Sequence, residues 1–164
     1  MFENFRVFET TFAGKKISFE TGKMCGLAGG SILVRYGGTT VLCNATMSEK
    51  PRDGIDFFPL SVDYEEKMYA VGKIPGSFLK RESRPSEKAV LASRMVDRPF
   101  RPLFPKDMRN DVSIVMTVMS VEQDYSPQVA GMFGSALALT ISSIPWNGPA
   151  IGVQVGLVDD QLIL

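Results

Sequence analysis

The 164-residue sequence contains no histidine and only two cysteines. Without histidine, this chain cannot form a Ser-His-Asp triad, a Cys-His pair, an HExxH zinc site or a histidine proton shuttle. Cys25 and Cys43 are too few for a zinc cage, and we expect both to be reduced, buried thiols of a cytoplasmic protein. These absences exclude histidine-dependent and cysteine-zinc chemistry from this chain.

The sequence also lacks a run of 18 consecutive apolar residues and a signal-peptide pattern at its start. The nearest candidate for a membrane segment is the uncharged stretch 125–158. Its apolar part, residues 129–144, contains serine and threonine and is followed by prolines and a glycine. We therefore expect a buried helix and strand in this region, and no membrane span.

The chain has no net charge, with 18 basic and 18 acidic residues, but the charge is unevenly distributed. Residues 73–109 hold ten of the basic residues and only four of the acidic ones. Such a concentration is expected of a site for phosphate or nucleic acid. Composition alone leaves an alternative open, which is a solvated helix face whose cations pair with neighbouring acids.

Local rules divide this basic stretch into a loop, residues 72–84, and a helix from Pro85 to Arg98. Pro85 suits the first turn of a helix, and Arg98 precedes Pro99, which disfavours helix and predicts a boundary. At 100° per residue the helix has one core face and one charged face. The core face holds Ala89, Ala92, Met95 and Val96 with Leu91 at its margin, and the charged face holds Glu87, Arg94, Asp97 and Arg98.

Arg94 and Arg98 are one helical turn apart and should point the same way. Two guanidinium groups in register suit phosphate oxygens, because each planar fork can bind bidentately. We therefore expect the pair to face a cleft and to bind an anion. The alternative is that Asp97 neutralises them within the helix.

The predicted loop presents two apolar residues followed by two cations, Phe78, Leu79, Lys80 and Arg81. This order suits single-stranded nucleic acid, because a ring can stack on a base, worth roughly 1–3 kcal/mol, while cations follow the backbone. The alternative is that Phe78 and Leu79 anchor the loop to the core.

The rest of the chain predicts strands first and then alternating helix and strand, which indicates an α+β domain. Paired carboxylates at Asp63 and Glu65 could hold a metal, but no third ligand lies nearby, so we favour a solvated strand face. A polar loop is expected at 49–55, a close-packed helix at 126–144, and a hairpin about Asp159-Asp160 between residues 151–158 and 161–164. The other predicted strands are 5–11, 15–20, 31–36, 39–47, 57–65 and 111–121.

Several long motifs, among them RYGGTTVLCNATMS, GSFLKRESRPSE and SRMVDRPFRPLFP, resemble the first RNase PH-like core domain of the polynucleotide phosphorylases. The resemblance runs through nearly all of the chain. It implies the α+β fold of ribosomal protein S5 domain 2, with the RNase PH unit duplicated in one long chain. On this basis we expect residues 1–164 to be the first core domain, with 149–164 beginning its C-terminal portion and cut at the chain end.

The resemblance implies a processive, phosphorolytic 3′→5′ exoribonuclease that transfers terminal nucleotides to orthophosphate, releases nucleoside diphosphates and can run in reverse. It also implies a homotrimer with single-stranded RNA in a central pore, Mg²⁺ assistance, a bacterial or organellar cytoplasm-like compartment, and proteins of RNA-degradation complexes as partners. The family's catalytic carboxylates and phosphate-binding loop belong to the second core domain. We therefore expect no catalytic residue and no metal ligand here, and a role in guiding RNA and forming the ring.

Two other interpretations stay open, a non-catalytic RNA-binding and assembly module and a truncated RNase PH-type nuclease. The positions that match the family's RNA-binding pattern are Phe78, Leu79, Lys80, Arg81, Arg84, Arg94, Arg98 and Arg101. Leu79 departs from the pattern, which usually has a second phenylalanine, and Lys80 keeps the charge without the planar fork. Ser83 replaces a usual glycine, and Gln154 replaces a common arginine.

Overall fold

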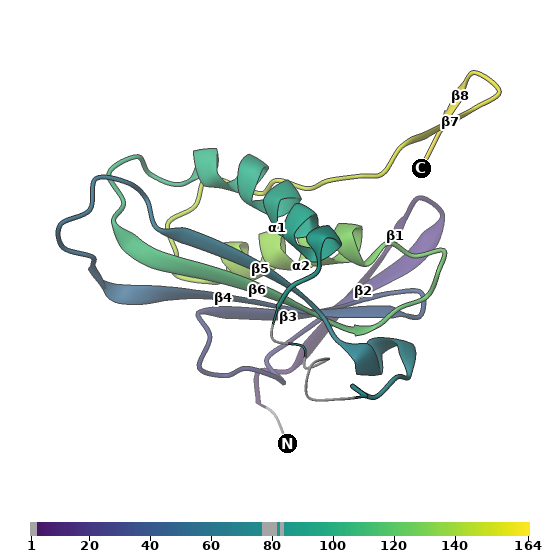
Figure 1. Cartoon of the computed structure of the whole chain (residues 1–164), viewed down its shortest axis with the longest axis horizontal. Coiled ribbons are helices and arrows are strands. Elements are labelled where there is room, and N and C mark those ends of the chain that lie inside the picture. The colour runs from purple at the N-terminus through teal and green to yellow at the C-terminus, as the bar shows by residue number, and fades with distance from the viewer. Residues whose placement is uncertain (1–2, 77–81, 83) are drawn as a thin grey trace.

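A computed structural model describes residues 3–76, 82 and 84–164, and its centre is a six-stranded sheet (Figure 1). The strands lie in the order β1-β2-β3-β4-β6-β5. Their bounds are β1 Arg6–Phe12, β2 Lys15–Thr21, β3 Gly30–Tyr36, β4 Thr39–Pro51, β5 Leu60–Glu66 and β6 Asn110–Ser120. The predicted α+β class is confirmed.

All neighbouring strands are antiparallel except β5 and β6, which run parallel. Parallel neighbours need a crossover connection, because a tight turn cannot join them. The crossover here contains a short 3-10 helix, η1 (Met68–Val71), the helix α1 (Glu87–Phe100) and a second 3-10 turn, η3 (Arg101–Leu103). The basic stretch of the sequence is therefore this crossover.

Helices α1 and α2 (Pro127–Ile141) cover the same face of the sheet (Figure 1). Helix α2 packs on β3 and β4, whereas α1 packs on the edge strand β5. Alternate strand residues point toward the helices and form the core, among them Ile32, Val34, Val41, Cys43, Ile114 and Met116. The small residues of α2 permit the predicted close approach, since a Cβ on Gly134 would lie 2.5 Å from Cys43 Sγ.

A short hairpin, β7 (Gly156–Val158) and β8 (Gln161–Ile163), projects from the sheet and helices (Figure 1). Asp159 and Asp160 form its turn with φ of 49° and 59°, the left-handed backbone that a tight two-residue hairpin turn requires. The predicted hairpin is confirmed, although its strands are shorter than expected.

Three predicted boundaries are wrong. Strand β4 continues through Pro51, where it pairs with Asn110 after a register irregularity, so the loop predicted from residue 49 begins later. Strand β5 begins at Leu60 rather than at 57, and α2 ends at Ile141 rather than at 144. None of the described helices has the length and apolarity needed to cross a membrane.

Both cysteines are free, but only Cys43 is buried, so the expectation that Cys25 is buried is wrong. Burial raises the pKa of the Cys43 thiol to about 12, and a hydrogen bond with Ser135 opposes this rise. A raised pKa leaves little thiolate near neutral pH, and thiolate is the reactive form. Thiol titration without reductant should therefore find one rapidly reacting thiol in the folded chain and two after denaturation. Finding no free thiol in the denatured, freshly prepared chain would contradict this.

Candidate RNA-binding surface

Helix α1 begins where its sequence provides a side-chain cap. Ser86 has extended backbone angles, and its Oγ accepts a hydrogen bond from the Ala89 N–H at 3.1 Å. Glu87 in the first turn complements the positive end of the helix dipole. Pro85 precedes the cap instead of lying in the first turn, so the predicted start at Pro85 is two residues early.

The predicted end of this helix at Arg98 is wrong, because α1 continues through Pro99 to Phe100. A proline this close to the end removes one backbone donor but can be tolerated when packing holds the last turn. Phe100 is fully buried against the core, and the Arg101 N–H bonds the Asp97 carbonyl. Tertiary packing therefore overrides the local preference of the Arg98-Pro99 pair.

The buried face of α1 is narrower than its sequence predicts. Ala89, Ala92, Val96 and Phe100 are buried. Met95, expected in the core, is 59% exposed, and Leu91 is 63% exposed. The helix rests on the single edge strand β5, so only a thin stripe of side chains is covered.

Arg94 and Arg98 are both exposed and lie on the side of α1 away from its buried stripe. Within the described part of the chain, neither side chain forms an ion pair. Asp97 pairs with Arg101 rather than with them. Two guanidinium groups one turn apart, in solvent and facing the same way, leave their donors available for phosphate oxygens.

Arg101 has a different environment from the other cations. Its Nη2 lies 2.6 Å from Asp97 Oδ1, and its Nε lies 3.3 Å from Oδ2 of the same carboxylate. The guanidinium also donates to the carbonyls of Phe58 and Leu60, both at 3.1 Å. Most of its donors are therefore engaged within the protein.

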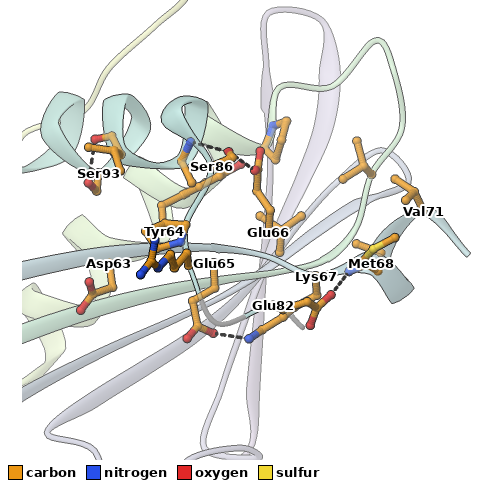
Figure 2. Close-up of a pocket in the computed structure, with 18 of the residues that line it drawn as sticks. Asp63, Tyr64, Glu65, Glu66, Lys67, Met68, Val71, Glu82, Ser86 and Ser93 are labelled. Carbon is orange, nitrogen blue, oxygen red and sulfur yellow. Dashed lines mark hydrogen bonds and ion pairs between the residues drawn. The ribbon is translucent and has the colours of Figure 1, made fainter. Parts of the chain in front are cut away.

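A cavity of about 750 Å³ lies beneath the start of α1, between β5, η1 and the chain around Glu82 (Figure 2). The expected cleft is not where Arg94 and Arg98 lie, since neither lines this cavity. Its charged lining residues are Asp63, Glu65, Glu66, Lys67, Lys73, Glu82 and Arg84. Acids outnumber bases in this set, so the cavity does not have the charge of a phosphate site.

Several of these carboxylates already have partners. Glu66 accepts from Ser86 Oγ at 2.5 Å, Glu82 accepts from the Met68 N–H, and Glu65 pairs with Lys67 (Figure 2). Tyr64 lies between them and is buried. Burial raises the pKa of Tyr64, with smaller contributions from the charges of Glu66 and Cys43.

The cavity does not supply a magnesium site. Glu65 accepts from Thr117 Oγ1 at 2.9 Å, so the Asp63-Glu65 pair is not free to converge on a cation. Among residues 3–76, 82 and 84–164, no group of three or more carboxylate, thiol or imidazole side chains could hold a metal. The donor set of these residues therefore does not fit the Mg²⁺ that the resemblance implies.

The predicted stacking and cationic loop lies outside the described residues. This applies to Phe78, Leu79, Lys80 and Arg81, and also to Ser83, so the predictions for them remain predictions. Arg84 is exposed and lines the cavity with Lys73, and Gln154 is exposed near the C-terminal hairpin.

One feature of the surface was missed at the sequence level, the bonding of Asp97 to Arg101. An acid and a base four residues apart on a helix are a signal for such a pair. The helix was predicted to end at Arg98, so Arg101 was not considered part of it. The carbonyls of Phe58 and Leu60 give no sequence signal at all.

The fold and its crossover helix define the class of protein. The RNase PH family model, described as 3′ exoribonuclease family, domain 1, matches residues 13–145, and the chain belongs to this family. Two solved structures share the fold at low identity. Rice Rrp46 superposes with a TM-score of 0.65 at 16% identity, over 99% of this chain and 68% of that one. A chain of the Archaeoglobus fulgidus exosome with RNA bound to the active site gives 0.55 at 19%, over 88% and 54%.

Closer relatives are curated bacterial proteins named polyribonucleotide nucleotidyltransferase. The protein of Ruminiclostridium cellulolyticum is 62% identical over 160 residues, covering 98% of this chain. That of Clostridioides difficile is 60% identical over 164 residues, covering all of it. This chain spans about 23% of the length of each of these relatives.

Proposed function

We propose that this chain is the N-terminal core segment of a phosphorolytic 3′→5′ exoribonuclease, and that it guides single-stranded RNA. The exposed, unpaired Arg94 and Arg98, in register on α1, are the observation that supports this most directly. The names of the relatives and the sequence motifs support the reaction class. The proposed RNA-binding residues are Phe78, Leu79, Lys80, Arg81, Arg84, Arg94, Arg98 and Arg101.

In the proposed reaction, an oxygen of orthophosphate attacks the phosphorus of the terminal phosphodiester. The bond to the 3′ oxygen of the preceding nucleotide breaks, so a nucleoside diphosphate leaves and the shortened RNA keeps a free 3′-hydroxyl. The same steps in reverse extend RNA. Arg94 and Arg98 bind backbone oxygens in this scheme, holding the strand in place without reading its sequence.

The full protein is proposed to be a cytoplasmic homotrimer that acts in RNA degradation and processing, with other RNA-degrading proteins as partners. Mg²⁺, when bound, would neutralise charge developing on the phosphates. Its ligands are expected in the second core domain, together with the catalytic carboxylates, since the residues described here do not provide them.

Division of labour between two core domains leads to a direct prediction. With poly(A), Mg²⁺ and orthophosphate, the full-length protein should release ADP, whereas residues 1–164 alone should release none above a buffer control. The segment lacks matched catalytic carboxylates and a phosphate loop. Release of ADP by the isolated segment, free of host enzyme, would contradict the assignment. No ADP from the full-length protein would contradict the function itself.

A further inference from the structure

Helix α1 is attached to the edge strand β5 at both of its ends. The two elements match in length, since 14 helical residues and 7 strand residues each span about 20 Å. At the helix start, Ser86 Oγ donates to Glu66, the last residue of β5. At the helix end, Arg101 donates to the carbonyl of Leu60, the first residue of β5.

The attachment at the helix end is the more extensive of the two. Arg101 uses two nitrogens on Asp97, one turn back along the helix, and two on the carbonyls of Phe58 and Leu60. The guanidinium also lies over the Phe58 ring, 6.0 Å from its centroid. Only a planar fork with several donors can make these contacts together, so lysine would not replace it.

The cations of the proposed RNA surface lie between these two attachments. Arg94 and Arg98 are on the outer face of the same helix, and Arg98 directly follows Asp97. Few apolar residues hold α1 down, because its buried stripe is thin and Leu91 and Met95 are exposed. Rotation or sliding of the helix would move both guanidinium groups, so polar contacts at its ends fix where they point.

We propose that Asp97 and Arg101 are positioning residues, which hold α1 on β5 so that Arg94 and Arg98 meet the RNA backbone in register. This inference rests on the proposed function, and it gives Arg101 an indirect part in RNA binding.

A direct and an indirect role for Arg101 predict opposite effects of one substitution, Asp97→Asn. If Arg101 binds RNA directly, neutralising Asp97 frees its fork and removes a repelling charge, so RNA should bind more tightly. If Asp97 and Arg101 position the helix, the same change loosens the attachment, and RNA should bind more weakly although an acid has been lost. Coupling of this kind commonly amounts to about 3- to 30-fold in affinity.

The test measures Kd for a long single-stranded RNA with the full-length protein, below the unfolding temperature of every variant. Asp97→Asn and Arg101→Lys should each raise Kd by about 3- to 30-fold. Asp107→Asn is the matched control, since it removes an exposed acid from the same basic stretch, and it should not weaken binding. In an Arg94→Ala/Arg98→Ala background, Asp97→Asn should have no further effect, because the groups it positions are gone.

Unchanged or tighter binding by Asp97→Asn, in a wild-type background that binds RNA, would overturn the positioning role and leave the proposed function standing. A full effect of Asp97→Asn in the background lacking Arg94 and Arg98 would also overturn it. Absence of RNA binding by the wild-type protein would remove both proposals. If Asp97→Asn fails to fold, Arg101→Lys decides, since retained affinity with lysine would indicate a plain charge contact instead of a fork.

Discussion

Replacing Arg94 and Arg98 together with alanine in the full-length protein should weaken RNA binding by about 100-fold or more. Hydrogen bonds to charged groups contribute about 1.5–3 kcal/mol each, and every 1.4 kcal/mol is about tenfold in affinity. Both side chains are exposed on α1, so their removal leaves no cavity and should change stability little. The measurement is Kd for single-stranded RNA, with the apparent KM for RNA in phosphorolysis beside it.

Lys106→Ala is a suitable control for this pair. Lys106 is an exposed cation of the same basic stretch, beyond the end of α1, and lies outside the proposed surface. It should change Kd by much less than either arginine. Equal effects of Lys106→Ala and Arg94→Ala would mean that net charge, rather than the register of two forks on one helix, determines binding.

Replacing Phe78, Lys80 or Arg81 should produce two distinguishable losses. Lys80→Ala and Arg81→Ala each remove a proposed phosphate contact, so affinity should fall for all RNAs alike and the salt slope by about 0.7 per contact. Phe78→Ala removes stacking, so it should cost roughly 1–3 kcal/mol of binding with little change in salt slope. In a homotrimer each change acts three times, so processivity on long RNA should fall.

A dinucleotide provides the control for the loop, since it is too short to reach beyond the reacting end. Its turnover should be spared by all three substitutions. Unchanged binding of long RNA by Lys80→Ala and Arg81→Ala would mean that the loop is structural, and that Leu79 marks a lost stacking site.

The sheet was predictable from the sequence because its signals are local. Alternating β-branched residues and the Gly37-Gly38 turn identify β3 and β4, and Gly37 has the φ of +58° that favours glycine. Strand pairing was not predictable in the same way. The parallel pairing of β5 with β6 depends on contacts between segments about 50 residues apart, which no local pattern specifies.

The candidate surface was predictable in its charge but not in its geometry. The spacing of Arg94 and Arg98 predicted their shared direction correctly, whereas Met95 was wrongly expected in the core. A helical wheel cannot know that α1 rests on one edge strand, which covers only a narrow stripe. The end of the helix was missed for a related reason, because the burial of Phe100 outweighs the local effect of Pro99.

The dependence of RNA affinity on salt, for the wild-type full-length protein beside Arg94→Ala/Arg98→Ala, tests the central claim most directly. Each neutralised phosphate of a single strand contributes about 0.7 to the slope of log Kd against log salt concentration. If the outer face of α1 binds the RNA backbone, the double variant should lower that slope by about 1.4 and bind more weakly at every salt concentration. An unchanged slope with unchanged affinity would contradict the account and would leave Arg94 and Arg98 as a solvated helix face.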